Sequence, residues 1–269
     1  NMGGQILDDR YEIKRQLGKK SGRWTLEALD LETQALVILK LIFLDDSLSA
    51  TDLRLFNREM DALKLLDHPA TPRHLDSFEI TLPLDGTALA LVQSHVPGRS
   101  LAYYFQNVRI FTQAEIQEIA HQVLTVLVQL HQQSPPIIHR DICPSNILLQ
   151  GEPNDADFAI ALVDFGSVKA LNTSTTSFTV LGAGGYQPPE QAGGRVLAAS
   201  DLYSLGVTLA EVMTVKPFKQ LQGGKLRIRI EDHCEVTEPF GSWFNQLIAP
   251  GLDYRWSSAQ AALSALDAL

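Results

Sequence analysis

The chain has 269 residues, of which 45% are hydrophobic and 20% charged, the composition of a soluble globular protein with one large domain or two small lobes. Its formal net charge is −9 and it has no dense run of Lys and Arg, which excludes duplex nucleic acid as an expected partner. Two cysteines and no apolar run of roughly 18 residues exclude a disulfide framework and a membrane span, so we expect a cytoplasmic protein.

The first ninety or so residues are typical of a small sheet. Short runs rich in β-branched and aromatic residues, bounded by turn-forming segments, predict strands over residues 11–17, 24–30, 36–43, 75–80 and 88–93. The segment 84–87 is a plausible hairpin turn. One helix, over residues 51–66, interrupts the strands.

The segment after Pro97-Gly98 is predicted to be mostly helical. Thr112 and Glu115 have the spacing of a capping box, and the apolar residues that follow keep helical periodicity. A later helix around residues 202–213 is apolar on several sides and is therefore predicted to be buried. A small sheet followed by a larger helical part indicates an α+β fold with two lobes.

Lys40 and Glu59 are the first candidates for chemistry. Glu59 shares a predicted helix face with Phe56, Leu63 and Leu66, and a carboxylate on an apolar face requires a buried cation. Lys40 ends the apolar run 36–39 and is a good candidate for that cation. The alternative is a lysine at a strand boundary and a glutamate at the rim of the helix face.

A second group of polar residues lies in the helical half. His139-Arg140-Asp141 is followed by Asn146, and then by Asp164-Phe165-Gly166. Asp and Asn supply the hard oxygen ligands that suit Mg²⁺, and a carboxylate on a loop can accept the proton of a hydroxyl group. Each tripeptide alone is a weak signal, but the ordered set with Lys40 and Glu59 is a strong one.

With these motifs the sequence resembles the eukaryotic-like Ser/Thr protein kinases of bacteria. The resemblance covers nearly the whole chain and also includes Gly185–Glu190, Asp201 and Arg255. It implies the bilobal protein-kinase fold, with an N-lobe at about 8–93, a hinge at about 94–98 and a C-lobe at about 99–269.

The resemblance also implies roles for individual residues. Lys40 would hold the α- and β-phosphates of ATP and pair with Glu59, while Asp141 would orient and deprotonate the acceptor hydroxyl. Asn146 and Asp164 would bind Mg²⁺. The positions that would surround the nucleotide, from the glycine-rich loop to the adenine pocket with its gatekeeper Gln93, are Leu17, Gly18, Thr25, Ile38, Gln93, Ser94, Val96 and Leu148. Glu190 with Arg255, and Asp201, resemble structural anchors of the family.

Several positions depart from the family pattern. Lys20 and Arg23 stand where the second and third glycines of the phosphate-binding loop belong, and side chains there obstruct the approach of backbone N–H groups to phosphate. Ile38 replaces an alanine over adenine and Thr25 a valine. Cys143 replaces a lysine that contacts the γ-phosphate, and Ala183 replaces the threonine that links that lysine to the catalytic aspartate.

The sequence therefore predicts an ATP- and Mg²⁺-dependent kinase that phosphorylates Ser and Thr of proteins, with weakened activity as one possibility. The alternative is a pseudokinase that binds a nucleotide or a partner without useful turnover. A small-molecule kinase is a third interpretation, against which Gly185–Glu190 speaks, because it resembles the peptide-positioning segment.

The segment after Asp164-Phe165-Gly166 is crowded with hydroxyl groups from Thr173 to Thr179. One interpretation is a polar, mobile loop. The other is autophosphorylation, with Arg140 pairing with a loop phosphate.

Overall fold

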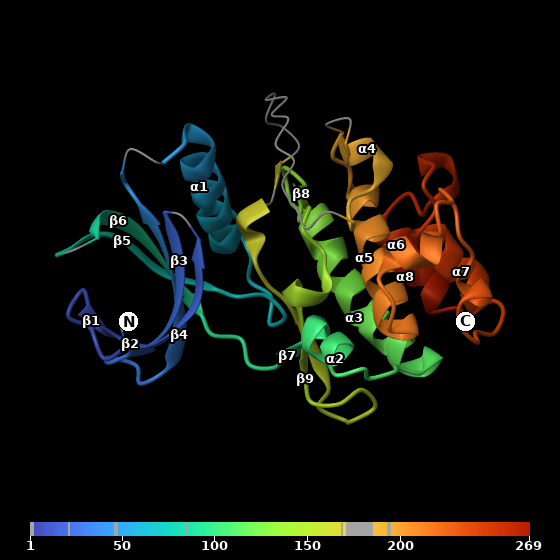
Figure 1. Ribbon diagram of the computed structural model, residues 1–269, viewed down its shortest axis with the longest axis horizontal. Helices are drawn as coiled ribbons and strands as arrows, with labels where there is room; N and C mark the ends of the chain where they lie inside the picture. Colours follow the sequence, from blue (N-terminus) through green and yellow to red (C-terminus); the bar gives the residue numbers. More distant parts are fainter. Residues whose placement is uncertain are drawn as a thin grey trace. The chain divides into compact units, whose positions relative to one another are not determined.

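The computed structural model describes residues 3–20, 22–45, 48–83, 85–167, 169–170, 185–192 and 195–269. Contacts between Cα atoms divide the chain into two compact units, Asn1–Val96 and Pro97–Leu269. The first unit contains a sheet and one helix, and the second is mainly helical (Figure 1). The α+β class and the β-rich and helical halves predicted from the sequence are confirmed.

The first unit is built on a six-stranded antiparallel sheet with the order β1-β2-β3-β4-β6-β5. Its strands are β1 (Ile6–Leu7), β2 (Tyr11–Lys20), β3 (Arg23–Asp30), β4 (Leu36–Phe43), β5 (His74–Leu82) and β6 (Gly86–Ser94). The five predicted strands are present, and all but β4 are longer than predicted. The short β1 was not predicted, and Leu84 of the predicted turn lies outside the described residues.

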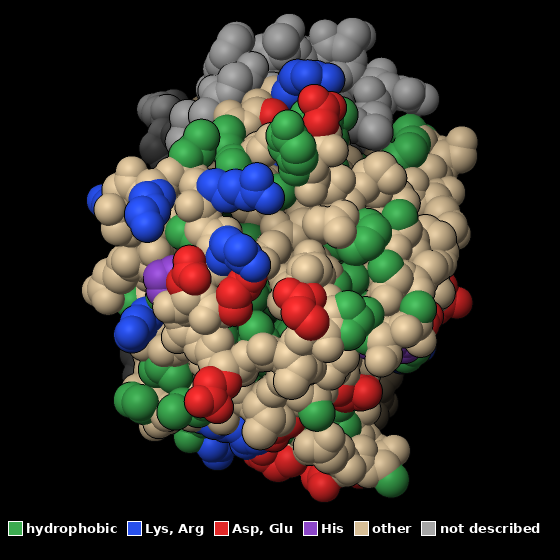
Figure 2. Space-filling model, turned by 90° about the vertical axis from the view of Figure 1, so that its right-hand side faces the viewer, with side chains coloured by type: hydrophobic (Ala, Val, Ile, Leu, Met, Phe, Trp, Pro, Cys, Tyr) green, Lys and Arg blue, Asp and Glu red, His purple; other side chains and the backbone are tan. Residues whose placement is uncertain are grey.

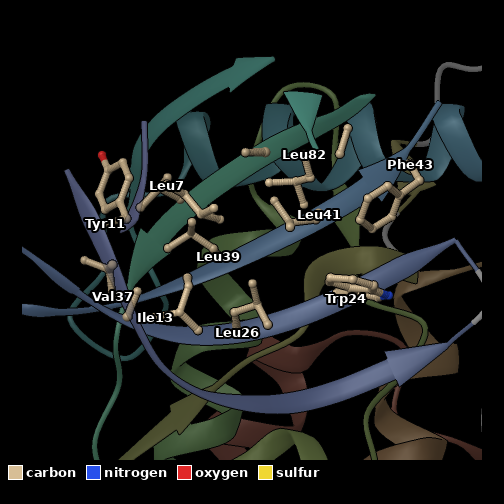
Figure 3. Close-up of a cluster of buried hydrophobic side chains, with 14 residues drawn as sticks. Leu7, Tyr11, Ile13, Trp24, Leu26, Val37, Leu39, Leu41, Phe43 and Leu82 are labelled. Carbon is tan, nitrogen blue, oxygen red and sulfur yellow. The ribbon is translucent and has the colours of Figure 1, made fainter. Parts of the chain in front are cut away.

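One face of this sheet forms a hydrophobic core. Side chains alternate between the two faces of a strand, and on β4 it is Val37, Leu39, Leu41 and Phe43 that join the cluster. Figure 3 shows them side by side with residues of the neighbouring strands, including Trp24, whose ring meets that of Phe43 edge-on at 4.7 Å between centroids. The alternate residues of β4 therefore point to the opposite face of the sheet.

The single helix of this unit, α1 (Ala50–Leu65), begins with a capping box. Ser49 accepts a hydrogen bond from the backbone N–H of Asp52, and the Asp52 side chain accepts from the backbone N–H of Ser49. These bonds satisfy N–H groups that have no partner within the helix. The buried side chains of α1 are Leu55, Phe56, Glu59, Ala62 and Leu63, which follow helical spacing as the sequence predicted.

The second unit is held together by helices. They are α2 (Leu101–Gln106), α3 (Gln113–His131), α4 (Pro189–Ala192), α5 (Ala198–Thr214), α6 (Phe218–Gln222), α7 (Phe240–Leu247) and α8 (Ala259–Leu266). Helix α3 begins at the predicted capping box of Thr112. Helix α5 is buried from Ala199 to Met213, which confirms the prediction of a buried helix.

Short strands and 3₁₀-helices complete this unit. The strands are β7 (Arg99–Ser100), β8 (Ile137–Ile138), β9 (Ile147–Gln150), β10 (Ala159–Leu162) and β11 (Lys169–Ala170). The 3₁₀-helices are η1 (Pro144–Asn146), η2 (Phe165–Ser167), η3 (Ile230–Asp232) and η4 (Leu252–Tyr254). Strand β9 pairs with β10 and β7, and β8 pairs with β11.

The surface of the second unit carries both signs of charge. Figure 2 shows Lys and Arg side chains interspersed with Asp and Glu on the face that lies to the right in Figure 1. A surface groove of about 760 Å³ is lined by residues of this unit that include Lys225, Arg227, Asp232 and Tyr254. Within the described ranges, no helix has the length and apolar character needed to cross a membrane.

Candidate active site

One half of the candidate site lies on the face of the first unit's sheet opposite the hydrophobic core. In the antiparallel register Thr25 is paired with Lys40, and Ile38 with Gln93. Directly paired residues point to the same face of an antiparallel sheet, so these four side chains share one face. Thr25 and Ile38 are half-buried there, at the positions where the family resemblance puts the roof over adenine.

The ammonium group of Lys40 donates to Glu59 Oε1 on α1, so the predicted ion pair is present in the structure. The two side chains are only 16% and 6% exposed. An ion pair removed from water to this degree is screened much less than a pair at the surface. It therefore fixes the lysine relative to helix α1, as a cation must be fixed if it is to meet phosphate oxygens in one geometry.

The β2–β3 hairpin differs from a glycine-rich phosphate loop in its contacts as well as in its sequence. Gly18 is paired with Thr25. The Lys19 ammonium lies over the Trp24 ring, 4.1 Å from its centroid, and the Arg23 guanidinium is bonded to Asp52 of α1. Ser21 and the side chain of Lys20 lie outside the described residues, and Leu17 is exposed.

The end of β6 carries the residues predicted to meet adenine. Gln93 is buried, and within the described part of the chain its Oε1 has no hydrogen-bond partner. The Ser94 N–H donates to Arg73 O at 2.9 Å. A bond from adenine to the Ser94 backbone would therefore have to use the carbonyl group. Val96 is half-buried at the end of the first unit.

The catalytic-loop residues of the second unit are shaped by a carboxylate on α5. Asp201 is fully buried and accepts hydrogen bonds from the backbone N–H groups of His139 and Arg140, at 2.9 and 2.8 Å. His131 Nε2 is 2.9 Å from the same carboxylate. Burial alone would raise the pKa of Asp201, but the His131 contact and the backbone N–H groups outweigh it and lower the pKa below its usual value. The predicted anchoring role of Asp201 is thus present in the structure, while the part played by His131 was not predicted.

Asn146 is tied to Asp141 at two points. Its amide nitrogen donates to the Asp141 carbonyl at 2.8 Å and to the Asp141 carboxylate at 3.2 Å. Because both bonds use the nitrogen, the oxygen of the amide group remains as an acceptor. Asp141 is half-buried.

The hairpin of β9 and β10 brings Asp164 close to Asn146 along the backbone. Ile147 is paired with Leu162, and the Val163 N–H donates to the Asn146 carbonyl at 2.9 Å. Asp164 follows at a φ of 64°, a left-handed conformation that Asp adopts more readily than most residues. Its carboxylate is exposed. Leu148, the predicted floor of the adenine site, is half-buried on β9.

The side chains beneath these residues are apolar or held neutral. The ring of His139 meets Phe165 edge-on at 4.8 Å between centroids, and both residues are fully buried. Burial lowers the pKa of His139. Cys143 is also buried, and burial, followed by the negative charge of Asp141, raises the pKa of its thiol to about 11. Cys143 is thus a neutral group at the position where the family has a cation; Ala183 lies outside the described residues.

The protein kinase domain model matches residues 11–255. The chain belongs to the protein kinase domain family. It is 31% identical to serine/threonine-protein kinase B of Synechocystis sp., over 97% of this chain and 47% of that protein. It is likewise 31% identical to PrkC of Bacillus subtilis, over 93% of this chain and 37% of that protein. This kinase domain therefore spans about half or less of the length of these two relatives.

Membership of the protein kinase domain family implies the use of ATP and, typically, of a divalent cation. The oxygen donors of Asn146 and Asp164 are hard ligands of the kind that such a cation takes. Within the residues that the structure describes, no cluster of three or more His, Cys, Asp or Glu side chains is arranged to hold a metal ion by itself. Two oxygen donors from the protein fit a divalent cation that takes its other ligands from phosphate and water.

Besides the contact of His131, sequence reasoning missed the contacts of Glu211 and the ion pair of Arg23. Tyr186 donates its hydroxyl hydrogen to Glu211 of α5, and the Phe218 N–H donates to the other oxygen of Glu211 at 2.7 Å. Arg23 forms an ion pair with Asp52. Tyr186 and Glu211 are 25 positions apart, and Arg23 and Asp52 are 29, so periodicity within one element gave no signal for these two contacts.

Proposed function

We propose that this kinase domain transfers the γ-phosphoryl group of ATP to Ser and Thr hydroxyl groups of proteins, in a Mg²⁺-dependent reaction in the cytoplasm. The observation that carries the proposal is the loop of Asp141 and Asn146. Its backbone is held by the buried Asp201, and Asn146 orients the Asp141 carboxylate. A carboxylate fixed in this way can accept the proton of a hydroxyl group as that group attacks phosphorus.

The other residues would supply positioning and charge. Lys40, fixed by Glu59, would hold the α- and β-phosphates, and Asn146 and Asp164 would hold Mg²⁺ through their oxygens. The Mg²⁺ ion, when bound, neutralises charge on the phosphate oxygens. Leu17, Gly18, Thr25, Ile38, Gln93, Ser94, Val96 and Leu148 would surround the nucleotide. With Cys143 uncharged, one positive group is missing beside the transferring phosphoryl, so we expect slower transfer than in a kinase with lysine there.

The test is transfer of labelled γ-phosphate from ATP to the protein itself and to a generic basic protein. We expect transfer that requires Mg²⁺ and that is lost in Asp141→Asn, which keeps the shape of the side chain but cannot accept the proton. Lys40→Met should also abolish it. Mass spectrometry of the same reaction should place phosphate within residues 173–179 if the loop is autophosphorylated. Binding of Mg-ATP, seen as a thermal shift, without any transfer would contradict the proposal and support a pseudokinase.

A further inference from the structure

Among the residues that the structure describes, two ion pairs join helix α1 to the sheet. Lys40 on β4 binds Glu59, and Arg23 on β3 binds Asp52. Asp52 and Glu59 are seven residues apart, so they lie on the same face of the helix, two turns and about 10.5 Å from each other. The buried residues of α1 occupy the same stripe.

The side chains of Arg23 and Lys40 also lie on the same face of the sheet. In the register of β3 and β4, Thr25 is paired with Lys40 and Arg23 with Ile42, so Arg23 and Lys40 point to the same face. The two contacts follow the same order along the strands and along the helix. Arg23 of β3 contacts Asp52 in the first turn of α1, and Lys40 of β4 contacts Glu59 in the third turn. The β2–β3 hairpin and the helix that carries Glu59 are thereby joined by a second, separate contact.

The Asp52 carboxylate is oriented and kept ionised by contacts within its own helix cap. Its carboxylate already accepts a hydrogen bond from the Ser49 hydroxyl at 2.6 Å. That bond, and then the charge of Arg23, lower the pKa of Asp52 below its usual value despite partial burial. The carboxylate is therefore ionised at neutral pH, and Arg23 is engaged with it.

We propose that Arg23 is a positioning residue that acts through Asp52: it sets the axial position of α1 so that Glu59 reaches Lys40. The proposal rests on the proposed phosphoryl transfer. The position of Arg23 in the degraded glycine-rich loop would suggest a phosphate ligand. The proposal assigns a different role to this residue. The β2–β3 hairpin would contact the nucleotide, and the Arg23–Asp52 ion pair would couple the position of α1 to the position of that hairpin.

Steady-state kinetics separate the two roles. Arg23→Gln and Asp52→Asn should each lower kcat by about two- to fivefold, the range that a partly exposed ion pair supports, with little change in the KM for ATP. The double variant should be no worse than either single variant, since both remove the same contact. If Arg23→Gln instead raises the KM for ATP and Asp52→Asn changes neither constant, Arg23 binds phosphate directly and the proposal is wrong.

Two control variants isolate the contact. Arg15→Gln breaks another arginine pair of the same hairpin, that with Glu27, which does not reach α1, and it should leave both kinetic constants unchanged. Ser49→Ala removes the cap of α1 while leaving the carboxylate of Asp52 in place. An effect of Ser49→Ala as large as that of Asp52→Asn, together with a silent Arg23→Gln, would show that only helix capping matters.

A second measurement does not depend on turnover. The Lys40 amine can be acetylated with an N-hydroxysuccinimide ester and the extent read by peptide mass spectrometry, with the exposed Lys216 as an internal reference. Arg23→Gln and Asp52→Asn should each increase acetylation of Lys40 by about two- to fivefold relative to the parent and to Arg15→Gln, because Glu59 shields the amine less. Unchanged acetylation would overturn the proposed positioning, whereas a parent without phosphoryl transfer would overturn the proposed function alone.

Discussion

Cys143 stands where the family resemblance places a lysine, and its backbone and side chain contribute differently to the catalytic loop. It lies between Asp141 and Asn146, and its carbonyl accepts a bond from the Asn146 N–H at 3.0 Å, so the loop has the local structure that these two residues need. The side chain is nevertheless a buried, neutral thiol. The backbone at this position therefore supports the loop, while the side chain supplies no charge.

We predict that Cys143→Lys raises the rate of phosphoryl transfer, by about tenfold or more when combined with Ala183→Thr, because an ammonium group would stabilise charge on the transferring phosphoryl. The two substitutions should act as a unit, so their joint effect should exceed the product of the single effects. Cys143→Ser, which adds no charge, is the control. Initial rates are the measurement, and a double variant no faster than an active parent would contradict the prediction.

The residues that the sequence identified are those whose partners follow from a motif. Lys40 and Glu59 could be paired because a carboxylate on an apolar helix face requires a cation. Arg23 could be recognised only as an arginine in place of a glycine. Its partner depends on the register of β3 and β4 and on the start of α1, which no short pattern contains.

An ion pair joins Glu190 of helix α4 to Arg255, the residue that follows the 3₁₀-helix η4. The Arg255 side chain is fully buried and donates to both oxygens of Glu190, at 2.6 and 3.2 Å. Its remaining N–H groups donate to the carbonyls of Ala249, Ala199 and Pro250. The predicted pair is therefore present, and all five N–H donors of the guanidinium are used.

We predict that Arg255→Met lowers the free energy of unfolding by about 3–5 kcal/mol, because it leaves the Glu190 carboxylate buried without its cation. Arg255→Lys should rescue little, since an ammonium group cannot make the two parallel bonds. The matched control is Arg229→Met, which breaks the largely exposed pair with Glu231 and should change stability little. Urea denaturation provides the measurement; an Arg255→Met protein as stable as the control would refute the prediction.

Most elements could be predicted because their periodicity is strong. The residues at which they begin and end could be predicted less often. The strand over 36–43 was predicted with the limits that β4 has. The start of α1 was predicted one residue late because its capping box uses Asp52 rather than the more common Glu or Gln. Strand β1 has two residues and exists through its pairing with β2, so no local pattern could reveal it.

Across the whole molecule, the departures from the family pattern and the internal structural contacts fall on different kinds of residue. Lys20, Arg23 and Cys143 are positions that the resemblance assigns to ligand contacts. Asp201 and the Glu190–Arg255 pair bind backbone groups or each other inside the second unit. The fold could thus be predicted closely from its structural contacts, whereas the departures concern positions that the resemblance assigns to the nucleotide.

The stability of the whole chain should depend on pH through the buried His139 and the half-buried His68 and His74. Burial lowers the pKa of His68, His74 and His139 from the usual 6.5. The unfolded chain then binds more protons than the folded one below pH 6.5, so the free energy of unfolding should rise from pH 5 to about pH 7. Urea denaturation across this range is the measurement, and His68→Gln with His74→Gln should reduce the slope. A stability that is flat or falls with pH would contradict the prediction.

The carboxylate of Asp201 also sets an order of events for a chain that leaves the ribosome from its N-terminus. His139 and Arg140 are synthesised about sixty residues before the group that accepts their N–H bonds. At the usual rates of translation, that interval lasts several seconds. During it water must satisfy these two N–H groups, and the loop of Asp141 cannot have its working shape. We therefore expect no phosphoryl transfer from a nascent chain in which α5 is still missing, because the Asp141 loop then lacks the carboxylate that holds the N–H groups of His139 and Arg140.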